Sequence, residues 1–289
     1  MRRFVVFLLL AALSGCNPYQ AEETETEEFR FATGPSRPSI EVRLEEGSIE
    51  IRGSESSSVE AEFVRRARSV DSEAARALLE RIEVSAVQDG DRIRFEGGAE
   101  SLPSFGRDLR TDLTLRVPRD VNVDVQTGDG VIEIQGIAGE VVAETSDGRI
   151  HVERVAGELR LRSEDGSIRG LELDGPLEAS TDDGEIALEG TFPRLSAVTS
   201  DGDIRVDCRE WPAEVSDWVV RTSDGSIFLT LPGSVSAEVD ATTSDGRIVN
   251  RLSSLEGAER EGRLRGKLGS GGPLLLLSTM DGLIELSER

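Results

Sequence analysis

Eight aspartates recur at one place in a repeated motif, so a column of carboxylates is the first candidate for chemistry. The motif reads Thr/Ser-x-Asp-Gly-x-Ile and occurs eight times. Ca²⁺ prefers carboxylate and backbone oxygens, so stacked copies could bind this cation, and we expect no other cofactor. Alternatively, each carboxylate accepts backbone N–H bonds within its own turn. The aspartates are Asp129, Asp147, Asp165, Asp183, Asp201, Asp224, Asp245 and Asp281.

A glycine follows each of these aspartates and predicts a tight turn. Glycine adopts positive φ without a steric cost, and we expect it to relieve strain at this position. The threonine or serine two residues before each aspartate shares the parity of the apolar residues, which predicts a hydroxyl ladder at the corner. The turn glycines are Gly130, Gly148, Gly166, Gly184, Gly202, Gly225, Gly246 and Gly282.

The segments between the turns alternate apolar and polar residues, as in Ile150-His151-Val152, which predicts short half-buried strands. The first four motif intervals are 18 residues, and the later ones are 23, 21 and 36. Such units bury their apolar faces by stacking, so we predict an all-β fold, a parallel β-solenoid of 18-residue coils over residues 119–289. Residues 261–264 would be a degenerate copy within the longest interval. The alternative is an antiparallel β-sandwich of hairpins.

Residues 29–118 repeat less regularly and predict a β-rich N-terminal cap with one short helix. Asp71 and Ser72 begin the helix, because Ala75, Leu78, Leu79 and Ile82 follow at helical spacing. A cap would cover the exposed strand edges at the end of the solenoid, where uncovered edges aggregate.

The formal net charge of −23 makes nucleic-acid binding unfavourable, because such a surface repels phosphates. A single histidine argues against a His-dependent triad or a multi-His metal site. Trp211 lies in the extra residues of the fifth coil, and Phe105 lies in a Gly/Ser-rich loop. Each is a candidate contact for a protein or glycan partner, and each has a structural alternative: Trp211 folds back over the solenoid, or Phe105 belongs to a plain surface loop.

The N-terminus resembles that of bacterial lipoproteins. Two arginines precede an apolar run from Phe4 to Leu13, and Leu13-Ser14-Gly15-Cys16 is similar to a lipobox. The resemblance implies a signal peptide over residues 1–15 and acyl chains, palmitate among them, on Cys16 that anchor the chain to a membrane. Asn17 favours the outer membrane by the same resemblance. Residues 16–28 would be the acylated cysteine and an acidic, disordered tether.

The Ser-Asp-Gly-x-Ile coils, preceded by the helix-bearing segment 74–91, resemble a bacterial β-strand-repeat family labelled "putative adhesin", a domain of unknown function. The resemblance covers about residues 38–286 and implies an extracytoplasmic β-solenoid with no established catalytic residues. We therefore expect a non-enzymatic envelope lipoprotein whose solenoid binds a protein or glycan. The alternatives are a carbohydrate-active β-helix lyase or hydrolase and a Ca²⁺-dependent surface repeat protein.

Overall fold

The computed structural model describes residues 4–6, 21–99 and 108–289, which form an all-β structure with one helix. The chain divides into two compact units, Met1–Ala138 (unit 1) and Gly139–Arg289 (unit 2). The predicted class, a solenoid of parallel strands, is confirmed. In the coil strands alternate residues are buried and form a core between the two sheets, as the alternation requires.

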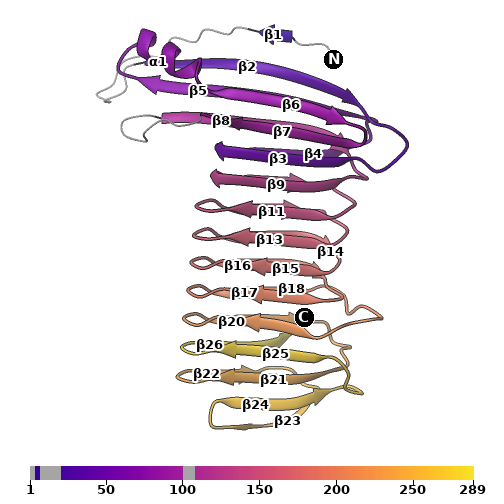
Figure 1. Ribbon diagram of the computed structural model, residues 1–289. Helices are drawn as coiled ribbons and strands as arrows, with labels where there is room; N and C mark the ends of the chain where they lie inside the picture. The colour runs from indigo at the N-terminus through magenta and orange to yellow at the C-terminus, as the bar shows by residue number, and fades with distance from the viewer. Residues whose placement is uncertain (1–3, 7–20, 100–107) are drawn as a thin grey trace. The chain divides into compact units, whose positions relative to one another are not determined.

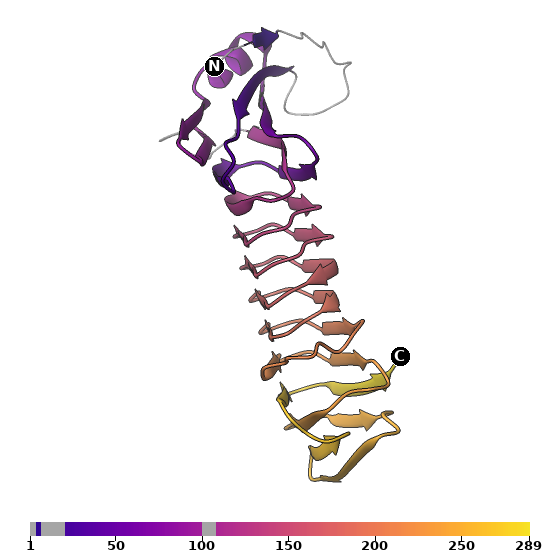
Figure 2. The ribbon, with the colours of Figure 1, turned by 90° about the vertical axis from the view of Figure 1, so that its right-hand side faces the viewer.

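Unit 2 consists of coils that contribute one strand to each of two sheets (Figures 1 and 2). Sheet A has the order β12-β14-β16-β18-β20-β26-β22, and sheet B has the order β11-β13-β15-β17-β19-β25-β21-β24-β23. The strands are β11 (Val141–Thr145), β12 (Ile150–Glu153), β13 (Leu159–Ser163), β14 (Ile168–Asp174), β15 (Leu177–Ser180), β16 (Ile186–Thr191), β17 (Leu195–Val198), β18 (Ile204–Cys208), β19 (Trp218–Arg221), β20 (Ile227–Leu231), β21 (Ala237–Thr243), β22 (Arg247–Asn250), β23 (Leu255–Arg260), β24 (Arg263–Leu268), β25 (Leu274–Thr279) and β26 (Leu283–Glu288).

The isoleucine of the motif sets the register of sheet A. Ile150 pairs with Ile168, Ile168 with Ile186, and Ile186 with Ile204, all in parallel strands. Each of these side chains is at most 1% exposed. A one-residue slip would turn the whole row toward solvent, so burial of this row fixes the register.

The C-terminal coils do not follow chain order, which differs from the sequential stacking that the repeat predicts. β25 pairs in parallel with both β19 and β21, and β26 pairs with both β20 and β22. The last coil of the chain therefore lies between two earlier ones. The predicted degenerate coil at residues 261–264 is wrong: Glu261 and Gly262, both with positive φ, form the turn of the antiparallel hairpin β23–β24. This hairpin pairs with β21 and covers its edge.

Unit 1 contains β1 (Phe4–Val6), β2 (Ala21–Ala32), β3 (Ser39–Glu46), β4 (Ile49–Ser54), β5 (Ser58–Ser69), α1 (Ser72–Leu79), β6 (Glu83–Asp89), β7 (Arg92–Gly98), β8 (Asp108–Pro118), β9 (Asn122–Asp129) and β10 (Ile132–Gln135). Its strand orders are β1-β2-β5-β8-β4-β10 and β9-β3-β7-β6. β3 and β4 already form a coil, because they pair in parallel with β9 and β10. The region expected to be a cap thus holds a coil of its own.

The predicted helix is confirmed as α1, which packs against β2 and β5 (Figure 1). Asp71 is its N-cap, and the carboxylate accepts the N–H of Ala74 at 2.8 Å. Leu79 and Ile82 are buried against Ala67 of β5. The apolar side of the helix therefore extends the core of unit 1.

The acidic segment predicted as a disordered tether is wrong for residues 21–28, which belong to β2. β2 pairs antiparallel with β5 along its whole length. Arg65, 13% exposed, lies 2.7 Å from Glu25 and donates to the carbonyl of Ile82 at 2.6 Å. Further ion pairs join Arg68 to Glu22 and Arg76 to Glu23. The arginines of β5 and α1 thus neutralise the acids that composition alone marks as unable to fold.

Candidate functional site

Trp211 stands on a preformed aromatic support in the loop between β18 and β19. Its ring centroid lies 5.4 Å from that of Trp218, and the two planes are tilted by 45°. Trp218 is fully buried, as predicted from its place in the repeat, and its Nε1 donates to the carbonyl of Phe192 at 3.2 Å. Phe192 contacts the Trp218 ring edge-to-face at 6.2 Å. Trp211 itself is half-buried, because one side rests on this cluster.

An open cleft of about 660 Å³ lies beside Trp211. Its lining comes from three loops on the side of unit 2 opposite the Asp-Gly turns: β18–β19, β20–β21 and β24–β25. The lining residues are Trp211, Pro212, Ala213, Glu214, Val215, Ser236, Gly271 and Pro273. This volume is within the range of small-ligand sites, and the lining is mainly apolar, as in such sites.

Hydrogen bonds hold the three loops in place. The N–H of Leu274 donates to Asp217 Oδ1 at 2.8 Å, and the N–H of Ser216 donates to the carbonyl of Pro193 at 2.8 Å. The hydroxyl of Ser270 donates to Ser236 Oγ at 3.2 Å. The cleft is therefore formed without a ligand, which lowers the ordering cost of binding.

The electrostatic character of this cleft is acidic. Glu214 is the one ionisable side chain among its lining residues. Glu210 and Asp217, both exposed, lie in the same loop. Among the lining residues Glu214 has no second carboxylate beside it, whereas hydrolysis of a glycosidic bond uses a pair of carboxyl groups. The arrangement is suited to binding.

The carboxylates of the Asp-Gly turns, the predicted cation ligands, are exposed in all eight copies. Asp183, Asp201, Asp224 and Asp281 follow one another in register. Within the described ranges, none of the eight side chains has a hydrogen bond or ion pair, so the turn-capping alternative is wrong. Over the same ranges no group of three or more acidic, Cys or His side chains could hold a metal ion. Ca²⁺ binding by the column stays a prediction.

Most of the turn glycines are required because neighbouring coils pack closely there. The expectation that they relieve strain at positive φ is wrong for these positions. Of the eight, all within the described chain, Gly202 and Gly282 have positive φ and the other six do not. A Cβ added to Gly184 would stand 2.8 Å from the carbonyl carbon of Gly166, and one added to Gly225 would stand 2.6 Å from that of Gly202. Stacked corners approach so closely that a side chain has no room.

The predicted column of buried hydroxyls exists, but its partners are carbonyls rather than other hydroxyls. Thr181 Oγ1 donates to the carbonyl of Gly166 at 2.9 Å, and Thr222 Oγ1 donates to that of Gly202 at 2.9 Å. Thr181 and Thr222 are 2–3% exposed. Each hydroxyl therefore joins one coil to the next at the corner where the glycines pack.

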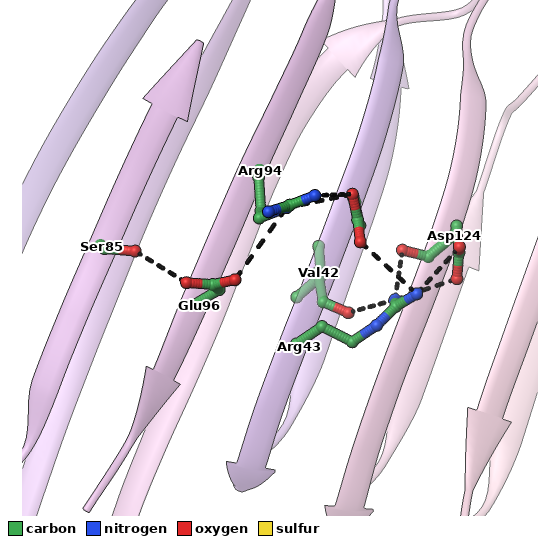
Figure 3. A network of polar contacts seen from close by, with 7 residues as sticks. Val42, Arg43, Ser85, Arg94, Glu96 and Asp124 are labelled. Atoms are coloured by element: carbon green, nitrogen blue, oxygen red, sulfur yellow. Dashed lines mark hydrogen bonds and ion pairs between the residues drawn. The ribbon is translucent and has the colours of Figure 1, made fainter. Parts of the chain in front are cut away.

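A chain of alternating charges crosses four strands of unit 1 and had no counterpart in the sequence motifs. Arg43 forms a bidentate pair with Asp124, with both N–O distances at 2.9 Å, and Arg94 Nε donates to Glu41 at 3.1 Å. The network runs through Ser85, Glu96, Arg94, Glu41, Arg43 and Asp124 (Figure 3). Each arginine is paired with carboxylates on its own or a neighbouring strand, so the network joins the strands of the sheet.

Three features complete the predicted set. Cys208 is buried with a free thiol, and burial, reinforced by Asp207, raises its pKa to about 12. Cys16 and Phe105 lie outside the described residues. Where the chain is described, no helix has the length and apolar character needed to cross a bilayer.

Comparison with known proteins agrees with the coil motif. Residues 38–287 match the family model described as Toastrack DUF4097, which confirms the predicted family. The chain is similar to a solved "putative lipid binding protein" from Parabacteroides distasonis, at 13% identity and a TM-score of 0.50, covering 91% of this chain and 96% of that chain. It is also similar to a "putative adhesin" from Bacteroides fragilis, at 12% identity and a TM-score of 0.36, covering 95% and 100%. No curated protein matches the sequence.

Proposed function

The chain belongs to the Toastrack DUF4097 family, and from that membership together with the lipobox-like N-terminus we propose a lipoprotein of the bacterial cell envelope whose solenoid binds a protein or glycan without catalysis. In this proposal Cys16 carries the lipid and the outer membrane is the site of anchoring. The coils supply a rigid framework, and the loops opposite the Asp-Gly turns supply the binding surface.

The cleft beside Trp211 is the observation that carries the binding role. It combines a supported aromatic ring, an apolar lining and loops fixed by hydrogen bonds. Tryptophan is enriched among the few residues that carry most of the binding energy at interfaces, and these residues occupy well-packed pockets. The single carboxylate in the lining supports a binding role over hydrolysis.

The anchor would hold the folded region close to the membrane. β2 begins at Ala21, five residues after Cys16. At about 3.5 Å per residue, this connection spans at most about 18 Å. The proposal therefore makes the protein a short-tethered one, in place of the longer acidic tether expected from composition.

Cell fractionation tests the anchor. Replacing Cys16 by Ala should move the protein from the membrane pellet to the soluble fraction, because the acyl chains are lost. Cys208→Ala is the matched control, since it removes the other cysteine, and this variant should stay in the pellet. Membrane association of Cys16→Ala equal to that of the unmodified sequence would refute the anchor.

Binding to envelope material tests the surface. Residues 21–289 on a support should retain a protein or glycan from a solubilised envelope fraction, and Trp211→Ala should retain less. The eluate is also analysed for new reducing ends. Release of sugar products with turnover would replace the binding role with an enzymatic one.

A further inference from the structure

The Trp211 ring is positioned to receive a cation. The ring packs against Trp218, with the centroids 5.4 Å apart, and it also lines the cleft. A positive group over the face of an indole is attracted by the negative charge density of the ring, and tryptophan is the best side chain for this contact. The ring is therefore a preorganised platform.

The charges around the platform favour the same kind of group. Glu214 lines the cleft, and Glu210 and Asp217 flank it in sequence on the same loop. The cations nearby are Lys267, with its stem beside Gly271, and Arg209, two residues before Trp211, which pairs with Glu189 at 2.6 Å. Lys267 lies opposite Glu238 and Glu256 in the register of the two neighbouring strands.

Apolar surface continues next to these acids. Val215 and Pro273 line the cleft, and Leu274 follows Pro273 with its side chain half-buried. Such surface can pack against the alkyl stems of long cationic side chains or against apolar neighbours in a peptide. A neutral sugar would use the ring but would leave the acidic excess without a counterpart.

Resting on the proposed binding role, we propose that the partner is a protein and that the cleft binds a basic segment of it. A lysine or arginine of this segment lies over the Trp211 ring and pairs with Glu214, and its apolar residues contact Val215 and Pro273. The net charge of −23 steers such a segment toward the surface.

Calorimetric titration with defined probes tests this inference. The probes are acetyl-KLKLK-amide, acetyl-ELELE-amide and cellopentaose, added to residues 21–289. We expect binding of the basic peptide alone, weakened when NaCl rises from about 50 mM to about 500 mM. Glu214→Gln should weaken this binding about fivefold, because one charge pair is lost.

The matched control is Glu144→Gln, which removes one negative charge from an exposed residue of β11, four strands along sheet B from β19. Its affinity should change less than about twofold, since it lies roughly 19 Å away. Trp211→Ala should weaken binding more than Glu214→Gln does. Glutamine has the same size and shape as glutamate, and residue 214 is exposed, so Glu214→Gln should fold normally. This variant therefore tests the inference even if Trp211→Ala fails to fold.

Three results would overturn the inference. Equal weakening by Glu214→Gln and Glu144→Gln would mean attraction by the overall charge alone. Binding of cellopentaose in preference to the basic peptide would assign the cleft to a glycan. Retention of envelope material without binding of any probe would leave the proposed function standing and remove the cleft as the site of a basic segment.

Discussion

Replacing Gly166 by Ala tests whether close packing of the corners, rather than backbone conformation, requires glycine there. Gly166 has no positive φ, so alanine suits its backbone. The new Cβ would stand 2.5 Å from the carbonyl carbon of Gly148 and 2.7 Å from Ser163 Oγ, with the Gly148 oxygen closer still. Ordinary contact begins near 3.4 Å and the Gly148 oxygen would stand at 1.7 Å, so the corners must separate by about 1.7 Å. Overpacking costs about 1–3 kcal/mol, and losing the bond from Ser163 Oγ to the Gly148 carbonyl costs about 1 kcal/mol more.

The expected loss in the free energy of unfolding is therefore about 2–4 kcal/mol, measured by urea denaturation followed by circular dichroism. Gly271→Ala is the control in the same unit. Gly271 has φ +79°, and the nearest atom to its added Cβ is the flexible end of Lys267 at 2.9 Å. A left-handed alanine costs about 1 kcal/mol. A loss for Gly166→Ala no larger than that for Gly271→Ala would refute the packing explanation.

Four further predictions concern Thr222, the ion pair of Asp240 with Arg263, Cys208 and the aspartate column. Thr222→Val should lower the free energy of unfolding by about 1–2 kcal/mol, because the Gly202 carbonyl loses its buried donor, while Thr222→Ser should retain most of the stability. Bonds from Arg263 lower the pKa of Asp240, so the ion pair stabilises the β23–β24 end fully above the ordinary carboxyl pKa. This stability should be lost as pH falls through the lowered pKa, and melting curves of Asp240→Asn should lack that acid dependence. Iodoacetamide should leave Cys208 unmodified at pH 8 until urea unfolds unit 2, because burial holds its pKa at about 12; rapid labelling of the folded protein would contradict this. If the aspartate column binds Ca²⁺, this cation should raise the melting temperature more than NaCl of equal ionic strength does and EDTA should reverse the rise, whereas equal shifts would contradict a cation site.

Local repetition makes the coils predictable. The isoleucine after each Asp-Gly pair recurs at an interval that matches one coil, so the repeat alone aligns Ile150 with Ile168, and the two residues do pair. The same rule places Trp218 in the core, because it occupies the position of Leu195 and pairs with it. The repeat predicts which residues pair because each coil packs against a coil of similar sequence.

The sequence repeat does not predict which strands pair when they lie far apart in the chain. The segment around Glu22 and Glu25 reads as disordered until its partners Arg65 and Arg68 are known, and those lie some forty residues later. The order of the last coils is hidden for a different reason. Identical motifs carry no mark of which copy is the neighbour, so the insertion of β25 between β19 and β21 has no sequence signature.

The candidate cleft is predictable only in part. The extra residues around Trp211 indicate an unusual loop, but whether the ring projects or folds back depends on Trp218 beneath it. Ser236 and Gly271 come from loops with no chemical signature, and only the stacking of the coils brings them beside Glu214. The cleft is a product of the three-dimensional arrangement.

The inserted last coil has a consequence for the order in which the chain folds. Val141 and Leu159 pair across 18 residues, whereas Trp218 and Leu275 pair across 57. Closing the longer loop costs about 1 kcal/mol more in chain entropy, and this cost arises before the strand contacts that offset it have formed. As the chain is synthesised, the coils up to β20 can assemble in order, but β21 and β22 cannot dock in their final place until the last residues are available. We therefore expect the end of unit 2 to form in a separate, slower kinetic phase, set by the arrival of the C-terminus.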